Sequence, residues 1–354
     1  MNRYHRQIII KSHGLEGQER LKNSKVLVVG CGGLGSPIAV YLASCGIGKL
    51  CIIDGDVVSS TNLHRQVWYQ ERDLGKYKAV VLSEFIREQN PDIQLIHLPY
   101  MLDKTNAAEL ISGYDIVVDG SDNFFTRYLI NDVCVENKIP LVFGAIYQYE
   151  GQVCVFNTYD ETHKPGPNYR DIFPDHTKMS SIQNCNEAGV IGVLPGIIGT
   201  LQAMEVINLI VDGKSPLEGK LLTVDAKTMN FTKIKLNKTF DNSKINHQKT
   251  NYYMYSSSIQ SIDKATYDAW VQNQLIFQLI DVRSKEEFEY YNINGINIPL
   301  NEIVNNISNI KTDIPVLFVC QSGARSKEAI NQVKANSNKE FNNLYNLEGG
   351  LSSF

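Results

Sequence analysis

Short apolar runs rich in β-branched residues alternate along the first half of the chain with stretches of helical periodicity. The runs are KVLVVG, KLCIID, IQLIHLP, DIVVDG and PLVFGA, and amphipathic stretches cover residues 35–45, 76–89 and 124–137. Continuous apolar strands separated by helices are typical of a parallel sheet that is covered on both faces. The pattern therefore predicts an α/β fold built on a mostly parallel sheet.

The pattern changes after the fifth apolar run. EGQVCVFN alternates as an antiparallel strand does, and residues 158–186 are polar, which predicts a long loop. The apolar stretch 187–212 ends in TLQAMEVINLIV and predicts a helix packed on the sheet. KLLTVDAKTMNFTKIKL then predicts a terminal hairpin.

A linker rich in Asn, Lys, Ser and Tyr divides the chain near residue 238. A second α/β pattern follows, with strands in LIFQLIDVR and PVLFVC and helices after Lys285 and Arg325. A length of 354 residues also favours two domains. We predict a first domain over 1–237, a linker over 238–258 and a smaller α/β domain over 259–354.

Charge and composition exclude several classes of partner. The net charge of −4 offers no basic surface for nucleic acid or for an anionic membrane. No apolar run reaches the length of a membrane span, and MNRYHRQIII lacks the layout of a signal peptide. The seven cysteines form no CxxC pair, which indicates a reducing compartment. We therefore expect a cytoplasmic protein.

The stretch GCGGLG, residues 30–35, follows a buried strand and opens into a helix, which is a Rossmann-like arrangement. Glycines at such a turn let backbone N–H groups approach a phosphate at the positive end of the helix. Asp54, at the end of the next strand, can accept a hydrogen bond from a ribose hydroxyl. Both ATP and a dinucleotide suit this site, which we expect to be formed by Gly30, Gly32, Gly33, Gly35 and Asp54.

Polar residues farther along separate these two ligands. SSTNLHRQ, GKYKA and DGSDNFFTR supply Asn62, Arg65, Gln66, Lys78, Asp122 and Asn123. Transfer of a nucleotidyl group brings several negative charges together, whereas hydride transfer does not. Arg65 and Lys78 can neutralise phosphate oxygens and Asp122 can hold Mg²⁺. The set favours ATP with Mg²⁺ over NAD, although each residue alone would read as an ordinary surface charge.

Cys320 lies in VLFVCQSGARS, directly after a buried strand and before a helix. Backbone amides of such a turn form an anion nest that stabilises a thiolate, and Arg325 completes a C-x4-R loop. A cysteine phosphatase uses the longer C-x5-R loop for a tetrahedral phosphate, so the shorter loop suits a single sulfur. We predict a persulfide on Cys320; the alternative is a buried structural cysteine.

RYHRQI, VLVVGCGGLGSP, IIDGDVVSSTNLHRQ, DNFFTR and EAGVIGVLPGIIGTLQAMEVIN together resemble the ThiF/MoeB family of adenylyltransferases, related to ubiquitin-activating enzymes, over residues 1–237. The resemblance implies a homodimer that adenylates the terminal Gly-Gly carboxylate of a ubiquitin-like sulfur carrier protein. It also implies that Arg6 reaches the partner's ATP as an arginine finger. Asp54 would bind the ribose, and Asp122 would bind Mg²⁺. The phosphates would be bound by Asn62, Arg65, Gln66 and Lys78.

The chain departs from that family at a structural zinc site. Asn168 and Asp171 stand in GPNYRDIFP where relatives have the first CxxC pair, and the tail carries no second pair. His163 and His176 cannot complete a tetrahedral set. We therefore predict no zinc.

Residues 259–354 resemble rhodanese, through LIDVRSKEEFE with Asp281 and Arg283, GINIPL and NLEGGLSSF. The usual GH is replaced by Tyr291 and Asn292, which puts recognition of the sulfur donor in doubt. Cys185 in SIQNCNEAGVIG either takes part in sulfur transfer or is an ordinary loop thiol.

The expected function is ATP-dependent adenylation of the carrier, followed by transfer of the Cys320 persulfide sulfur to give a thiocarboxylate. The donor that loads Cys320 would be an enzyme such as a cysteine desulfurase, in a molybdopterin, thiamin or tRNA-thiolation pathway. The alternatives are an NAD-dependent oxidoreductase, a non-catalytic scaffold that binds the carrier, and a ubiquitin-type activator. The last of these normally needs further domains.

Overall fold

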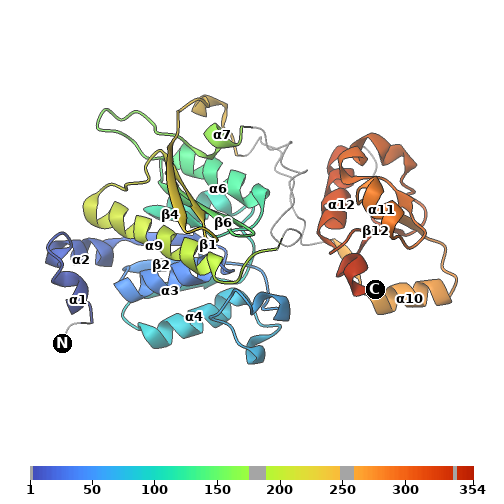
Figure 1. The fold of residues 1–354 in the computed structure, drawn as a ribbon, viewed down its shortest axis with the longest axis horizontal. Coiled ribbons are helices and arrows are strands. Elements are labelled where there is room, and N and C mark those ends of the chain that lie inside the picture. Colours follow the sequence, from blue (N-terminus) through green and yellow to red (C-terminus); the bar gives the residue numbers. More distant parts are fainter. Residues whose placement is uncertain (1–2, 175–188, 248–258, 338–340) are drawn as a thin grey trace. The chain divides into compact units, whose positions relative to one another are not determined.

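The computed structural model describes residues 3–174, 189–247, 259–337 and 341–354. These residues fall into two compact units, the first holding the described residues up to 247 and the second those from 259 (Figure 1). The two units are described separately below.

The first unit is built on an eight-stranded sheet in the order β3-β2-β1-β4-β5-β6-β7-β8. The first five strands along the chain pair in parallel, and β6, β7 and β8 add to this sheet in antiparallel fashion. The predicted strands, the antiparallel strand and the terminal hairpin are thus confirmed. The strands are β1 (Lys25–Val29), β2 (Lys49–Ile53), β3 (Gln94–Leu98), β4 (Ile116–Asp119), β5 (Leu141–Tyr147), β6 (Glu150–Phe156), β7 (Lys220–Asp225) and β8 (Asn230–Lys235).

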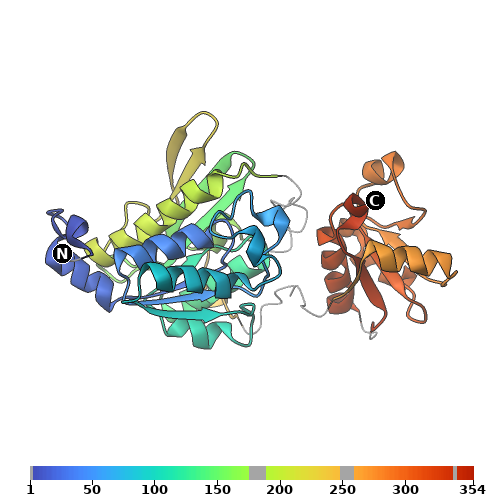
Figure 2. The same ribbon diagram turned by 90° about the horizontal axis from the view of Figure 1, so that it is seen from below.

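Helices cover both faces of this sheet, as Figures 1 and 2 show. The helices α3, α4 and α9 pack together in one layer, and α5, α6 and α7 pack together in the other. The predicted helices over 35–45 and 124–137 are confirmed, while the third begins at Lys78 rather than at residue 76. The helices are α1 (His5–Ile8), α2 (Gly14–Asn23), α3 (Gly35–Cys45), α4 (Lys78–Gln89), α5 (Ala107–Ser112), α6 (Phe124–Asn137), α7 (Tyr169–Ile172) and α9 (Leu194–Asp212).

The helix α9 is the one described helix whose length and apolar composition would allow it to cross a membrane. Half of that stretch is buried inside the unit, where it packs against α3, β5 and β6. The buried side chain of Gln202 donates from Nε2 to the carbonyl oxygens of Asp119 (2.8 Å) and Val142 (3.3 Å). These contacts identify α9 as a core helix that packs over the end of β4 and the first residues of β5.

The strands β2 and β3 lie on one side of β1, and β4 and β5 lie on the other, so the strand order reverses between β1 and β4. Three glycines meet at this point. Gly30 has a φ of +93°, and a Cβ on Gly35 would lie 1.7 Å from the carbonyl oxygen of Gly30. A Cβ on Gly120, just after β4, would lie 2.9 Å from Cα of Gly35. Ligands of open α/β sheets bind outside the carboxyl ends of the strands at such a switch point.

Residues 238–247 belong to the first unit, which differs from the linker predicted over 238–258. Lys238 binds Asp171, Ile245 is buried, and His247 hydrogen-bonds Glu136 of α6 through its backbone N–H (2.9 Å) and its ring. The polar composition that indicated a linker here serves side-chain hydrogen bonds instead.

The second unit has a five-stranded parallel sheet in the order β11-β10-β12-β13-β9. The helix α12 (Ala324–Asn336) packs on β12 and β13, and an aromatic cluster that includes Trp270 of α10 packs on the sheet. The smaller α/β domain is confirmed. Its other elements are β9 (Gln260–Ile262), α10 (Lys264–Gln272), β10 (Gln278–Asp281), α11 (Lys285–Tyr290), β11 (Ile296–Asn297), β12 (Val316–Val319) and β13 (Leu344–Leu347).

We predict that Gly35→Ala lowers the free energy of unfolding by more than about 3 kcal/mol, because the new methyl group meets backbone atoms that cannot move aside. Gly196→Ala in α9 is the matched control, since nothing described lies within 4 Å of its Cβ position. The control should be neutral or more stable by up to about 1 kcal/mol. Urea unfolding compares the two, and equal stability would refute the collision.

Candidate functional site

The glycine turn at the end of β1 is held by two side chains from neighbouring segments. The backbone N–H of Cys31 donates to Oδ2 of Asp54 (2.6 Å), and the hydroxyl of Tyr69 donates to the carbonyl oxygen of Cys31 (2.6 Å). Asp54 follows β2, and its Oδ1 also accepts from the N–H of Asp56 (2.7 Å). The turn and the carboxylate predicted for the ribose are therefore adjacent.

Asp54 and Lys78 are both buried at this edge of the sheet. Burial raises the pKa of Asp54 to about 6, against the opposing effect of Lys78. Burial also works against the charged form of Lys78, but Asp54 and Asp56 outweigh it, so the pKa of Lys78 lies above its usual value. Lys78 Nζ donates to Oδ2 of Asp56 at 2.9 Å. The site thus holds a permanent cation beside a carboxylate that titrates near neutrality.

The SSTNLHRQ segment forms one wall of the turn. Gln66 is buried, its Nε2 lies 3.5 Å from the Cβ position of Gly32, and its Oε1 is a buried acceptor without a described partner. The backbone carbonyl of Asn62 accepts from the N–H groups of Arg65 (3.0 Å) and Gln66 (2.9 Å). The guanidinium of Arg65 donates to the carbonyl oxygen of Thr61 (2.9 Å). The structure brings this segment against the glycines, as predicted.

The DGSDN turn follows β4 at the same edge. Asp122 is exposed, and its charge acts on both Lys78 and Asp119. Asn123 accepts from the N–H of Thr126 (2.9 Å) and so caps α6, and its amide NH₂ can still donate to a nucleotide. An exposed carboxylate near a buried lysine suits Mg²⁺, which takes oxygen ligands from one or two carboxylates and from phosphates.

Arg6 does not lie near its own glycine turn. It is exposed on α1, and that helix is fixed at the opposite end of α3, where Gln7 donates to the carbonyl oxygen of Cys45 (3.0 Å). The ring of Tyr4 also lies against Gly46, which ends α3. Any action of Arg6 on ATP therefore requires a second copy of the chain and stays a prediction.

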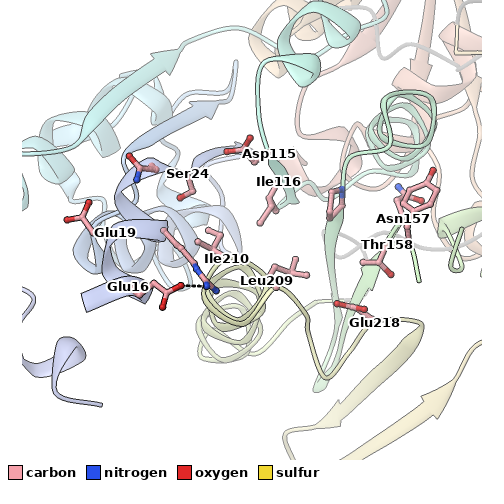
Figure 3. Close-up of a pocket in the computed structure, with 15 residues that line it drawn as sticks. Glu16, Glu19, Ser24, Asp115, Ile116, Asn157, Thr158, Leu209, Ile210 and Glu218 are labelled. Carbon is pink, nitrogen blue, oxygen red and sulfur yellow. Dashed lines mark hydrogen bonds and ion pairs between the residues drawn. The ribbon is translucent and has the colours of Figure 1, made fainter. Parts of the chain in front are cut away.

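A pocket of about 700 Å³ lies at the other edge of the sheet, between α2, the end of α9 and the starts of β4 and β5 (Figure 3). Glu16, Glu19, Asp115 and Glu218 line it, and Arg20 is already paired with Glu16 (2.5 Å). Acidic groups repel a triphosphate. This pocket contains none of the predicted residues and is not the nucleotide site.

In the second unit, Cys320 directly follows β12 and is fully buried. The N–H of Gly323 donates to Sγ of Cys320 at 3.1 Å, and the hydroxyl of Ser326 lies 3.4 Å from the same sulfur. Ser326 also donates to Oδ1 of Asn346 (2.7 Å). One backbone donor of the expected nest, the N–H of Gly323, is therefore directed at the sulfur, and Ser326 lies beside the sulfur while its hydroxyl donates to Asn346.

Two arginine–carboxylate pairs surround this loop. Arg325 forks onto Glu287 of α11 (2.7 and 2.9 Å), and this bond holds the pKa of Glu287 at about 2. Arg283 forks onto Asp281, with Nη2 2.7 Å from Oδ2, and donates to the carbonyl oxygen of Tyr291 (2.6 Å). Arg325, which ends the C-x4-R loop, is therefore tied to α11 and can brace that loop.

Cys185 lies outside the described residues. Among the described cysteines other than Cys320, burial raises the pKa of the thiols, well above its ordinary range at Cys31 and Cys134. A thiol that stays protonated is a poor nucleophile. Cys320 is the described cysteine whose surroundings suit sulfur chemistry.

Residues 4–245 match the ThiF family, and residues 263–354 match the rhodanese-like domain. The chain belongs to the ThiF family. It is 40% identical to the probable molybdopterin-synthase adenylyltransferase of Porphyra purpurea, over 99% of this chain and 92% of that protein. It is 34% identical to the probable adenylyltransferase/sulfurtransferase MoeZ of Mycobacterium tuberculosis, over 99% and 91%. This ThiF-family chain is thus an adenylyltransferase with a sulfurtransferase domain, as predicted.

The fold is also shared with a solved structure. The crystal structure of Escherichia coli MccB with AMPCPP and selenomethionine MccA superposes with a TM-score of 0.57 and 24% identity. The match covers 67% of this chain and 72% of that one. This likeness confirms the Rossmann-like fold of the first unit.

A cluster of polar side chains occupies the place where this ThiF-family chain departs from its zinc-bearing relatives. Lys238 Nζ donates to Oδ2 of Asp171 (3.1 Å) and to Oδ1 of Asn242 (2.6 Å), and Asn168 donates to the same Asn242 oxygen (2.8 Å). Burial opposes ionisation of Asp171, but hydrogen bonds from the N–H groups of Phe240, Asn168 and Thr239 and from Lys238 outweigh it and lower its pKa. The side-chain ammonium group of Lys238 thus links the segment 168–173 to the segment 238–247.

Sequence reasoning missed several residues that shape the ThiF-type site. Asp56 pairs with Lys78, and Tyr69 holds the glycine turn. Asp119, the first residue of DGSDN, accepts a hydrogen bond from the N–H of Ser121. In the sequence, Asp119 is marked only as a carboxylate at the end of a strand. Asp56 is marked only as a second carboxylate two residues after Asp54.

We predict that Lys238→Met lowers the free energy of unfolding by about 1–3 kcal/mol, because it leaves the buried Asp171 carboxylate without its ammonium partner. Lys244→Met, on an exposed residue of the same segment, should change the free energy of unfolding by less than about 0.5 kcal/mol.

Because we predict no zinc, incubation with EDTA should leave the unfolding temperature of the unmodified protein unchanged. Stoichiometric zinc in the purified protein, or loss of stability on chelation, would contradict this.

We also predict a pH dependence that comes from Asp54. Its carboxylate gains a proton as the pH falls through about 6, so the affinity for ATP should fall about tenfold between pH 7 and pH 5. Because the folded-state pKa is raised, its contribution to stability runs the other way and is lost as the pH rises from about 4 to about 6. Asp54→Asn should bind ATP weakly with a flatter profile, and an identical profile in both proteins would rule out Asp54.

Proposed function

We propose that the chain uses MgATP to adenylate the C-terminal glycine of a ubiquitin-like sulfur carrier protein and then converts that adenylate into a thiocarboxylate. One observation supports this above the others. A single chain joins a glycine turn, with its buried Lys78, to a loop that directs the N–H of Gly323 at the sulfur of Cys320. The name of the Mycobacterium tuberculosis relative, a probable adenylyltransferase/sulfurtransferase, couples the same two activities.

In the first step the carrier carboxylate attacks the α-phosphorus of ATP. A C–O–P linkage forms, and the bond to pyrophosphate breaks. The carboxylate is ionised at neutral pH, so catalysis rests on positioning and on charge rather than on a general base. Lys78 and Arg65 would neutralise phosphate oxygens, Asn62, Gln66 and Asn123 would position them, and Asp54 would bind the ribose. Asp122 would hold Mg²⁺, which supplies positive charge to the phosphates.

In the second step the outer sulfur of a Cys320 persulfide attacks the acyl carbon of the adenylate. A C–S bond forms as the C–O bond to AMP breaks, which leaves the carrier joined to Cys320 through a disulfide. Release of the thiocarboxylate then needs a second thiol that takes over Cys320 in a disulfide, and we assign this thiol to Cys185. Arg325 would brace the loop through Glu287 during these exchanges.

The partners follow from this reaction. They are a carrier that ends in Gly-Gly, a sulfur donor such as a cysteine desulfurase, and a second copy of the chain that supplies Arg6. Two further relatives are named as the sulfur carrier protein adenylyltransferase of Thermus thermophilus and the SAMP-activating enzyme E1 of Haloferax volcanii, which supports the carrier. Because one chain carries both domains, the donor sulfur stays at high effective concentration near the adenylate. We place the reaction in the cytoplasm, within a molybdopterin, thiamin or tRNA-thiolation pathway.

We predict that Cys320→Ser retains carrier-dependent ATP–pyrophosphate exchange within about twofold but forms no thiocarboxylate, because only the persulfide chemistry is removed. Cys45→Ser, on a thiol away from both sites, is the control and should retain both activities. Mass spectrometry of the carrier measures the product. Unchanged thiocarboxylate at limiting sulfide would remove Cys320 from the mechanism, and NAD binding without any exchange would overturn the adenylation.

A further inference from the structure

Two buried residues that the proposed reaction does not use hold the turn that carries Asp122. Asp119, the last residue of β4, accepts hydrogen bonds at Oδ1 from the N–H (2.9 Å) and the hydroxyl (2.6 Å) of Ser121. Arg127 donates from Nη2 to the carbonyl oxygen of Ser121 (3.2 Å). The N–H, carbonyl and hydroxyl groups of Ser121 are therefore all engaged, directly before Asp122.

Arg127 is itself held in one orientation. It lies one turn into α6, is 8% exposed, and its guanidinium carbon lies 5.6 Å from the ring centres of both Phe124 and Phe143. Its Nε lies 3.9 Å from Oδ2 of Asp119. A planar guanidinium can face two rings while it reaches a carboxylate and a carbonyl, which the single ammonium of lysine cannot do.

The other side of Asp122 is fixed as well, because Asn123 caps α6 by accepting from the N–H of Thr126 (2.9 Å). Asp122 therefore stands between a clamped residue and a helix cap. Its own carboxylate is exposed and accepts no hydrogen bond from the described residues, so it is available to a ligand. Its charge already acts on Lys78 across the site.

We propose that Asp119 and Arg127 are a positioning pair that orients the Asp122 carboxylate for the divalent cation of the ATP complex. This inference rests on the proposed adenylation. The pair does not touch the nucleotide. It holds the turn in place before the cation binds, so that little of the free energy of cation binding is spent on ordering the turn. A loosened turn should weaken cation binding more than nucleotide binding.

The test compares Arg127→Lys with the unmodified protein by titrating Mn²⁺ in the presence of a non-hydrolysable ATP analogue. The electron paramagnetic resonance signal of free Mn²⁺ reports binding without turnover. Arg127→Lys keeps a cation beside Asp119 but loses the planar contact with Ser121. We expect the half-saturating Mn²⁺ concentration to rise at least fivefold, while the KM for ATP at saturating metal changes less than twofold.

Arg170→Lys is the matched control. Arg170 is also buried, forks onto a buried carboxylate, Asp132 (2.7 and 2.6 Å), and lies over the rings of Tyr128 and Phe240. These contacts join Arg170 to α6 and to Phe240, and not to the turn from Ser121 to Asp122. It should lose comparable thermal stability and keep its Mn²⁺ half-saturation within twofold.

Equal Mn²⁺ shifts in the two variants, or a folded Arg127→Lys with unchanged Mn²⁺ binding, would overturn the positioning role. If Arg127→Lys does not fold, Asp119→Asn serves instead, because it keeps the acceptor for Ser121 and removes only the charge behind Arg127; we expect a shift of at least twofold. Pyrophosphate exchange by the unmodified protein separates the two conclusions. Its absence refutes the adenylation itself, whereas exchange with an unaffected variant refutes only the pair.

Discussion

The close approach of three glycines at the switch point of the first sheet is the constraint on which the nucleotide site depends. Gly30 turns the chain with a positive φ, Gly35 lets α3 begin against that turn, and Gly120 lets the end of β4 pass beside both. Any side chain at Gly35 would push α3 away from β1. The N-terminal N–H groups of the helix would then no longer face the place where β1 and β4 diverge, and a phosphate would lose its donors.

Charge burial is the second feature that shapes both units. Lys78, Arg127, Arg170 and Arg283 are all largely buried, and each lies beside at least one carboxylate. An unpaired buried charge would cost several kcal/mol, whereas a pair costs far less and fixes the geometry of the groups that it joins. At the nucleotide site this arrangement is asymmetric. Asp54 keeps a raised pKa despite its lysine neighbour, whereas Lys78 keeps its charge and supplies a buried cation that suits phosphates.

The two units place their reactive groups by the same rule, although they are unrelated in sequence. In each, a buried parallel strand ends at its carboxyl edge and a tight turn leads into a helix. In the first unit the turn is rich in glycine, which suits the close approach of a phosphate. In the second, the Cys320 sulfur itself lies at the turn, with the N–H of Gly323 directed at it. One chain thus carries a site that suits phosphates and a site that suits sulfur chemistry.

The alternation of apolar runs and helices, the glycine turn and the cysteine loop are local properties, and they determined the fold class, both domains and most candidate residues. Tertiary structure decided what depends on distant contacts. Arg127 meets Asp119 and Phe143 only because β4, α6 and β5 pack together, and Lys238 meets Asp171, which lies 67 residues earlier in the chain. A packed polar segment and a linker have the same composition, so the sequence predicts a linker over residues 238–247, which the tertiary structure packs on the first unit. Spacing along a sequence encodes periodicity and turns, whereas the pairing of buried charges depends on the angles at which those elements pack.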